Sequence, residues 1–238
     1  MNLYADLHTH TIASGHAYST INELAAAAAK KGLKAIALTD HGPALPGGPH
    51  EYHFRAMRFV PRHIDGVRIL RGVEANILNE RGDLDLAEEV LAELDFVMAG
   101  IHDAVGFCGR SPKVYTRALL AVMENPLVKC ISHPGNPEFP SQYEEVVQAA
   151  VRTGTALEIN NSSVGGVSRK GSCRNCLEVA RLCARYGARV LIGSDAHIAQ
   201  GVGVFDDAIK LVTEAGIPEE QVLNASWERL LAFLGDEG

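Results

Sequence analysis

The sequence lacks an apolar stretch long enough to cross a membrane. Its longest apolar run, residues 24–29, is Ala-rich and far shorter than the roughly 20 residues that a membrane-spanning helix needs. It does not begin like a secretory signal peptide. Cysteine is scarce too: there are five, an odd number that does not fit a framework of paired disulfides. We therefore expect a cytoplasmic protein with reduced thiols and no membrane partner.

The sequence also lacks an excess of basic residues. It has 22 Lys and Arg against 29 Asp and Glu, a formal net charge of -7, and no long basic run. Proteins that bind nucleic acids in general neutralise phosphates with Lys and Arg, so this balance argues against such a role. Two motifs are absent as well: the G-x-S-x-G turn of serine hydrolases and the G-x-x-x-x-G-K-[ST] phosphate loop.

The sequence does contain a short apolar strand followed by a helix, repeated about seven times. Such alternation indicates a parallel sheet, and polar residues at the carboxyl ends of the strands favour a closed barrel over a doubly wound open sheet. No linker divides the chain, so we expect one α/β domain over residues 1–238. The expected strands are residues 4–10, 34–39, 67–73, 96–101, 128–132, 156–159 and 190–193, and the expected helices are 21–31, 83–93, 113–123, 144–153, 174–186, 205–215 and 226–234.

Histidines and carboxylates follow the expected strands, at one rim of the expected barrel. His8 and His10 lie two apart in the first strand and so project from one face, and alternation would put Asp6 on that face too, as a partner for a ligand imidazole or in a salt link elsewhere. The candidate ligands are nine in all: His8, His10, His16, His41, Glu74, His102, His133, Asp195 and His197. Nine ligands are too many for one tetrahedral ion and suit two or three ions of zinc, manganese or iron.

A cluster of divalent ions is suited to hydrolysis. Such ions lower the pKa of a shared water, bind substrate oxygens and stabilise an in-line displacement. A phosphate ester is the natural substrate, because its charge suits cations and its leaving oxygen can rest on an ion. We expect a phosphomonoesterase in which a metal-bridging hydroxide attacks phosphorus, with no catalytic residue beyond the metal ligands.

Four residues after the sixth strand are candidates for substrate binding. Arg169 and Lys170 lie in a Gly-flanked loop and are expected to bind the substrate phosphate, while Asn160 and Ser163 are expected to line the pocket. Each also has a plain structural interpretation, as a solvated loop or a strand-end cap. Three rival functions stay open: an amidohydrolase with one or two ions, a nuclease, and a metal-loaded scaffold without catalysis.

Five motifs in this chain resemble the PHP (polymerase and histidinol phosphatase) family. They are D-L-H-T-H, T-D-H-G, G-V-E-A-N, I-S-H-P-G-N-P and G-S-D-A-H. Together with H-A-Y-S, A-L-E-I-N-N-S-S and S-R-K-G-S, they make the whole chain similar to the YcdX-type phosphatase branch of that family. The resemblance implies a distorted seven-stranded β/α (TIM-like) barrel and three divalent ions, usually zinc and sometimes manganese or iron. A homotrimer is consistent with related proteins.

The same resemblance assigns each of the nine positions to an ion. It places His8, His10, Glu74 and Asp195 on one ion. Glu74 would bridge to a second, which His102 and His133 complete, and His16, His41 and His197 would hold a third. All nine positions carry the residue types of the family.

Overall fold

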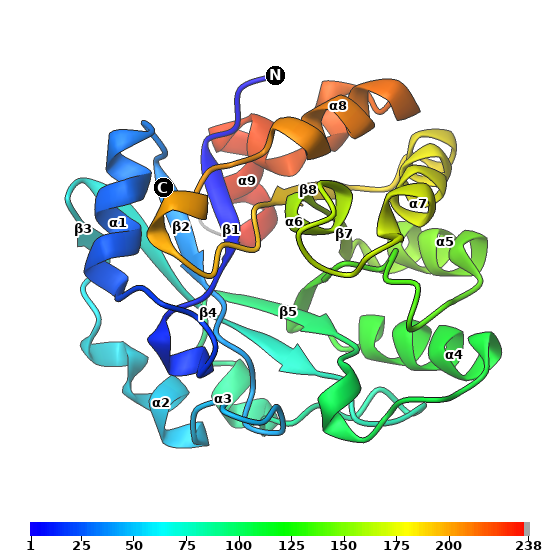
Figure 1. Ribbon diagram of the computed structural model, residues 1–238, viewed down its shortest axis with the longest axis horizontal. Coiled ribbons are helices and arrows are strands. Elements are labelled where there is room, and N and C mark those ends of the chain that lie inside the picture. Colours follow the sequence, from blue (N-terminus) through cyan, green and yellow to red (C-terminus); the bar gives the residue numbers. More distant parts are fainter. Residues whose placement is uncertain (236–238) are drawn as a thin grey trace.

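The computed structural model describes residues 1–235, and residues 236–238 of the expected single domain lie outside it. Helices surround a central set of strands (Figure 1). The strands are β1 (Ala5–Thr9), β2 (Ala35–Leu38), β3 (His63–Ile64), β4 (Val67–Asn76), β5 (Phe96–Gly100), β6 (Val128–Ile131), β7 (Ala156–Asn160) and β8 (Val190–Gly193). The helices are α1 (Ile21–Lys30), α2 (Glu51–Ala56), α3 (Glu88–Leu91), α4 (Pro112–Met123), α5 (Tyr143–Thr153), α6 (Asn161–Val164), α7 (Ser172–Tyr186), α8 (Asp206–Ala215) and α9 (Trp227–Leu234).

Seven parallel strands form a nearly closed barrel in the order β1-β2-β4-β5-β6-β7-β8. The two ends of this path meet through backbone hydrogen bonds beyond β8: His10 N donates to Ala196 O at 2.8 Å, and Ala196 N donates to His8 O at 3.3 Å. The seven-stranded barrel predicted from the sequence is therefore confirmed, and the open-sheet alternative is wrong. The short strand β3, which the sequence did not predict, pairs antiparallel with β4.

The long strand β4 lies between β2 and β5. Residues 68–71 pair with β2 and residues 72–76 with β5, and Glu74 also bonds to the segment after β2, since Glu74 N donates to Asp40 O and Gly42 N donates to Glu74 O. A Cβ atom at Gly72 would lie 2.6 Å from the carbonyl oxygen of Phe96. Only glycine allows β4 and β5 to approach this closely at this position.

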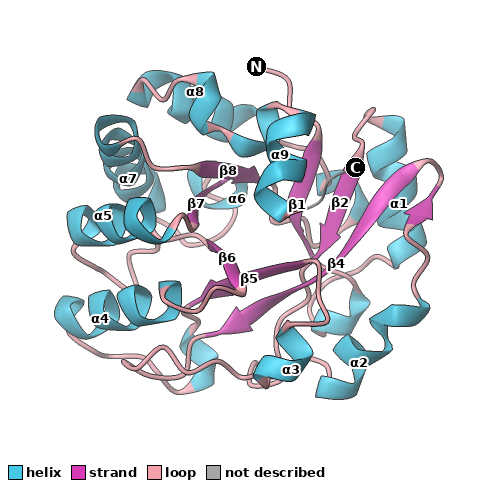
Figure 2. Cartoon of the chain, turned by 180° about the vertical axis from the view of Figure 1, so that it is seen from behind, coloured by secondary structure: helices cyan, strands magenta, loops and turns pink. Residues whose placement is uncertain are grey.

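The inside of the barrel is apolar at one end and polar at the other. Inward residues at the strand starts, such as Leu70, Phe96 and Met98, form one buried cluster with Leu230 of α9, so α9 closes the amino-terminal end (Figure 2). Further along the same inward faces lie Glu74 and Glu158. Because side chains alternate along a strand, the rim residues share a face with the apolar core and point into the barrel.

A register shift in β1 changes the expected alternation. Its pairing with β2 shifts between Asp6 and Thr9. Ala5 and Leu7 face the apolar interior, yet His8 and His10 both reach the rim, since a bulge adds one residue to the strand. Asp6 is therefore not on the face of the two histidines, and that prediction was wrong.

One further segment differs from expectation, and another agrees with it. The helix predicted for residues 83–93 is only α3, because the stretch before it is held extended: Leu78 N donates to Asp83 O, and Ile77 forms a bridge with Leu84. The segment up to His53, for which the sequence allows a loop or a partly helical stretch, is partly helical: α2 follows a series of turns. Within residues 1–235, none of the helices combines the length and apolar character needed to span a membrane.

Candidate metal centre

Four side chains place their donor atoms at the corners of a small polyhedron at the rim. His8 Nε2 lies 3.0 Å from His10 Nε2, 3.3 Å from Glu74 Oε2 and 3.3 Å from Asp195 Oδ1. His10 Nε2 lies 3.3 Å from Asp195 Oδ1 and 3.5 Å from Glu74 Oε2. Donors that bind one tetrahedral zinc ion lie about 3.3 Å apart. The spacing therefore fits a single shared ion.

The other oxygen of Glu74 belongs to a second group. Glu74 Oε1 lies 3.2 Å from His102 Nε2 and 2.7 Å from His133 Nε2, and the two imidazole nitrogens are 3.3 Å apart. Glu74 is fully buried and thus presents one oxygen to each group. One carboxylate therefore contacts two groups of candidate metal donors.

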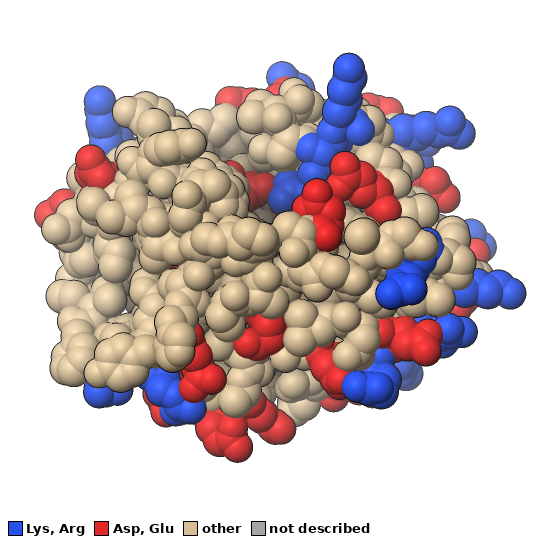
Figure 3. Space-filling view, turned by 60° about the horizontal axis from the view of Figure 1, so that its bottom comes forward, with Lys and Arg blue, Asp and Glu red and all other residues tan. Residues whose placement is uncertain are grey.

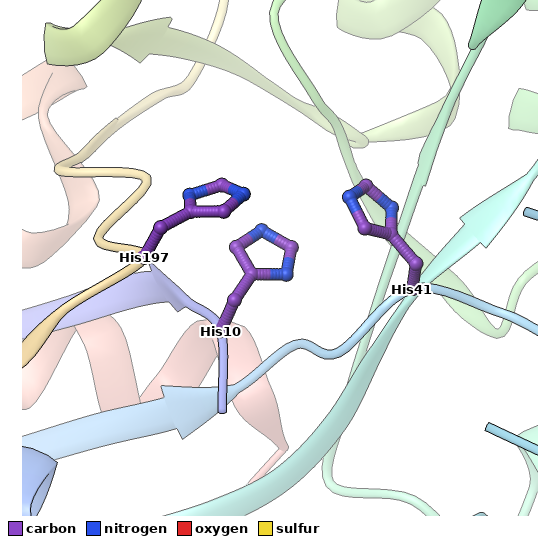
Figure 4. A group of neighbouring side chains, drawn as sticks. All are labelled: His10, His41 and His197. Atoms are coloured by element: carbon purple, nitrogen blue, oxygen red, sulfur yellow. The ribbon is translucent and has the colours of Figure 1, made fainter. Parts of the chain in front are cut away.

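Three more histidines lie on the open side of this pair of groups. Ligand atoms of His41, His197 and His10 lie within 4.8 Å of one another (Figure 4). The exposed His16 is next to them, its ring centroid 5.1 Å from that of His41 and 4.9 Å from that of His197. The structure therefore brings all nine expected ligands together. The ring of His10 lies as close to the rings of His41 and His197 as that of His16 does.

Two buried polar atoms fit a bound cation. Seven buried side-chain atoms of the described residues have no hydrogen bond, and two of them lie at this rim: His41 Nδ1, 3.2 Å from Glu74 Oε2, and Asp195 Oδ1, 3.3 Å from His8 Nε2. Leaving a buried polar atom unpaired is unfavourable, whereas a metal ion would satisfy both atoms. The imidazole and carboxylate donor set is one that zinc, manganese and iron accept.

Glu158 fixes the orientation of His8, a role that the sequence did not reveal. Its Oε1 accepts from His8 Nδ1 at 2.7 Å, and its Oε2 accepts from His133 N at 2.8 Å. A ligand histidine that donates through Nδ1 keeps the Nε2 lone pair free for the metal. The sequence feature that could have indicated this role is that Glu158 is the one charged residue within an apolar strand, two residues before Asn160.

Ser14 does the same for His10. His10 Nδ1 lies 3.1 Å from Ser14 Oγ, which donates to Asp40 Oδ1 at 2.7 Å and accepts from His41 N at 3.2 Å. Since the hydroxyl proton points to the carboxylate, its lone pairs face the His10 ring. Asp40 is therefore a further buried partner of the site that sequence reasoning missed.

Asp6 supports the loop that carries Asp195. It accepts from Ser194 Oγ, from Ser194 N at 3.1 Å and from Gly203 N at 2.8 Å. Burial raises the pKa of Asp6, and these donors counteract the rise. Asp6 thus positions a backbone turn and not an imidazole.

Backbone strain is concentrated at the site. Four non-glycine residues in the described chain have positive φ, and three of them are His133 (φ 30), Arg169 (φ 49) and Asp195 (φ 58). Such conformations are uncommon for residues other than glycine, although His and Asp adopt them more readily than most, and they persist where surrounding contacts enforce them. The turns after β6 and β8 are therefore shaped to aim side chains into the barrel.

The two carboxylates at the centre are ionised. Burial would raise the pKa of Glu74, but the imidazoles of His8, His41, His102 and His133 hold it well below its usual value. Burial opposes ionisation of Asp195 as well, and His8 and Arg169 together hold its pKa well below the usual range. Both groups are thus ready to bind cations at neutral pH.

A pH-dependent loss of stability follows from His133. Burial and the nearby Arg169 lower the pKa of His133 to about 4. Its neutral form therefore contributes stability that is fully present above the unfolded pKa of about 6.5 and is lost as pH falls toward about 4. We expect the chelated protein to lose about 2 kcal/mol from this group between pH 7.5 and pH 5.

Urea denaturation at both pH values measures this loss. His133→Asn removes the titrating group, so the variant should lose less stability than the wild type over the same interval. An equal loss in the two proteins would contradict the assignment to His133.

A cavity of about 700 Å³ opens beside the candidate metal centre. Arg169 lines it, with Nη1 2.7 Å from Asp195 Oδ2, while Lys170 is exposed and is not among the lining residues. Asn160 and Ser163 are buried: Asn160 Nδ2 donates to Asp195 Oδ2 at 3.2 Å, and Ser163 Oγ accepts from Arg169 at 3.2 Å. Of the four residues expected to bind substrate, Arg169 alone is among those lining the cavity.

Comparison with known proteins identifies the family. The model of the PHP domain matches residues 6–162. The chain is 51% identical to a probable phosphatase of Syntrophotalea carbinolica, with 97% of this chain and 95% of that protein covered. It is 49% identical to a probable phosphatase of Acetivibrio thermocellus, with 98% and 96% covered. The predicted enzyme class agrees with these names.

Solved structures support the fold. Histidinol phosphate phosphatase from Lactococcus lactis, solved in complex with zinc, L-histidinol and phosphate, superposes with a TM-score of 0.62. The identity is 19%, with 90% of this chain and 94% of that chain covered, so the likeness concerns the barrel alone. Taken with the family match and the close relatives, it leads to one conclusion: the chain belongs to the PHP domain family.

Proposed function

We propose that this protein is a phosphatase that uses three divalent metal ions, with zinc as the first choice, to hydrolyse phosphate monoesters. The observation that carries the proposal is Glu74, whose two oxygens serve two separate groups of donors. The first ion would be held by His8, His10, Glu74 and Asp195, and the second by Glu74, His102 and His133. His16, His41 and His197 would hold the third, with His10 close enough to take part.

The ions would supply a water made nucleophilic at neutral pH and positive charge to bind the phosphate oxygens. The protein keeps the ligands in place and shapes the space beside them. Glu158 and Ser14 fix the imidazoles of His8 and His10, and the cavity accepts the rest of the substrate. The residues that line this cavity include the apolar Leu45, Ile101 and Phe139. A compact, partly apolar leaving group fits this wall.

Arg169 is the candidate that we retain for binding the substrate phosphate. Its side chain is mostly buried, yet it lines the cavity and contacts the ligand Asp195. Burial would lower the pKa of Arg169, but Asp195, Glu74 and Glu158 raise it. A guanidinium held in this way has donors left for a phosphate oxygen, because it offers five N–H groups in all.

Substitution of Arg169 tests this role. We expect Arg169→Met to lower kcat/KM for a phosphate monoester by about 10- to 100-fold, the size of a lost charged hydrogen bond. Lys170→Met is the matched control, since Lys170 is an exposed neighbour, and it should change kcat/KM by less than about 3-fold. Equal effects of the two substitutions on steady-state kinetics would refute the role of Arg169.

A small substrate fits the surface better than a nucleic acid. On the face shown in Figure 3, Lys and Arg are interspersed with Asp and Glu and do not form one basic area. The formal net charge of -7 agrees with this distribution. A cytoplasmic location and a homotrimer stay predictions.

A substrate panel tests the proposed function. Protein loaded with zinc, manganese or iron is assayed with an aryl phosphate, a set of biological phosphate monoesters, single-stranded DNA and amide substrates. We expect release of phosphate from monoesters. Hydrolysis of amides alone would favour an amidohydrolase, cleavage of DNA alone a nuclease, and no hydrolysis with any metal a scaffold.

A further inference from the structure

We propose that Asp85 is a positioning residue that sets the tautomer of His102 through Asn76. This inference rests on the proposed function, in which His102 binds a metal ion through Nε2. Asp85 belongs to none of the motifs that resemble the family, and it lies in a stretch predicted to be helical. The structure instead places it between the end of β4 and the turn after His41.

Hydrogen bonds connect His102 to Asn76 and Asn76 to Asp85, and each has a defined donor. His102 Nδ1 lies 2.7 Å from Asn76 Oδ1. Asn76 Nδ2 lies 2.6 Å from Asp85 Oδ2 and 3.2 Å from Gly42 O. Since both hydrogens of the Asn76 amide face acceptors, its oxygen must face His102. The imidazole therefore donates through Nδ1, and the lone pair of Nε2 is free for a metal.

Asp85 can act here only as an acceptor. Its Oδ1 accepts from Asn76 N at 2.8 Å, and its Oδ2 accepts from Ala44 N at 2.9 Å as well as from Asn76 Nδ2. Every oxygen of the carboxylate thus faces an N–H group. An amide of the same shape would set its NH₂ against a donor whichever way it turned: against Asn76 N in one orientation, and against Ala44 N and Asn76 Nδ2 in the other. Rotation of Asn76 removes the conflict with Nδ2. Rotation of Asn76 would present NH₂ to His102 Nδ1 and move the imidazole proton to Nε2.

Gly42 allows Asp85 to occupy this position. A Cβ atom on Gly42 would lie 2.3 Å from Asp85 Oδ1. Asp85 also holds the turn that leads to Leu45 and Pro46, which line the cavity. The same carboxylate therefore links a metal ligand to the wall of the substrate cavity.

The test compares Asp85→Asn with Asp83→Asn. Asp83 is two residues away, and its side chain contacts Asn79 and Arg81 at the surface. ¹⁵N spectra of histidine-labelled, chelated protein report the tautomer of His102 directly, and competition with a chelator reports metal affinity. We expect Asp85→Asn to shift the His102 tautomer and to weaken one metal site by about 10- to 100-fold. Asp83→Asn should change neither.

A double variant separates this role from simple anchoring of the turn. In Asn76→Asp/Asp85→Asn, a carboxylate at position 76 can again accept from His102 Nδ1. We expect it to restore the tautomer and part of the metal affinity, although Ala44 N loses its partner and Gly42 O loses the hydrogen bond from the Asn76 side chain. A double variant no better than Asp85→Asn, or a wild-type tautomer in Asp85→Asn, would overturn the proposal.

A second variant and a measurement that does not depend on activity complete the test. If Asp85→Asn does not fold, Gly42→Ala displaces the same carboxylate and should give the same change in tautomer; an unchanged tautomer there would overturn the proposal. The NMR measurement needs neither metal nor substrate. Absence of phosphatase activity in the wild type would thus count against the proposed function and leave the role of Asp85 decided by the spectra.

Discussion

Replacing Glu74 with glutamine is expected to lower phosphatase activity by at least about 10³-fold, because the ions it would bridge each supply several kcal/mol of transition-state stabilisation. The carboxylate lies within 3.5 Å of donor atoms of His8, His10, His41, His102 and His133. An amide of the same shape offers one oxygen where two are needed. Its NH₂ group would point at an imidazole nitrogen that should face a cation.

Activity assays and elemental analysis of the same sample test this expectation. Glu138→Gln is the matched control, since Glu138 lines the cavity but is not one of the nine candidate ligands. The control should bind as much metal as the wild type, whereas Glu74→Gln should lose at least one ion. A Glu74→Gln protein with wild-type metal content and activity within tenfold of the wild type would contradict the bridging role.

Removal of the metal ions is expected to lower the unfolding temperature by about 10 °C or more. One site saturated at 1,000 times its Kd contributes about 4 kcal/mol, and each kcal/mol shifts the midpoint of a chain of this size by about 2–4 °C. The physical reason is the burial of Glu74 and Asp195, whose charges the ions would neutralise. Buried charges without sufficient compensation destabilise a fold.

Differential scanning calorimetry before and after chelation measures this shift. Zinc added back should restore the original midpoint, which distinguishes loss of metal from irreversible damage. Glu74→Gln should show a smaller shift than the wild type because it binds fewer ions. An unchanged midpoint in the wild type would mean that the nine residues do not hold structurally important ions.

The barrel and the gathering of the nine candidate ligands at one rim could be predicted because both follow from local patterns. Apolar strands ending in His102 or His133 place those side chains at the carboxyl edge of a parallel sheet, where such ends meet. Glu74 was found by the same rule, although β4 continues past it to Asn76. The family resemblance then assigned ligands to ions, which strand spacing alone does not do.

The supporting residues could not be predicted, because they depend on contacts between distant segments. Glu158 contacts His8 across 150 positions, and Asn76 contacts His102 across 26. The bulge in β1 also escaped prediction, since Leu7 and His8 both fit a simple alternating strand, and it misplaced Asp6. Asp85 looked helical because its tertiary partners, Asn76 and Ala44, are invisible in the local pattern.

The most direct test of the central claim is a zinc titration of chelated protein, followed by phosphate release from a monoester at each step. The account predicts that three equivalents bind per chain and that activity appears as the cluster fills. Saturation at one equivalent, or full occupancy without hydrolysis of any phosphate monoester under zinc, manganese or iron, would contradict it.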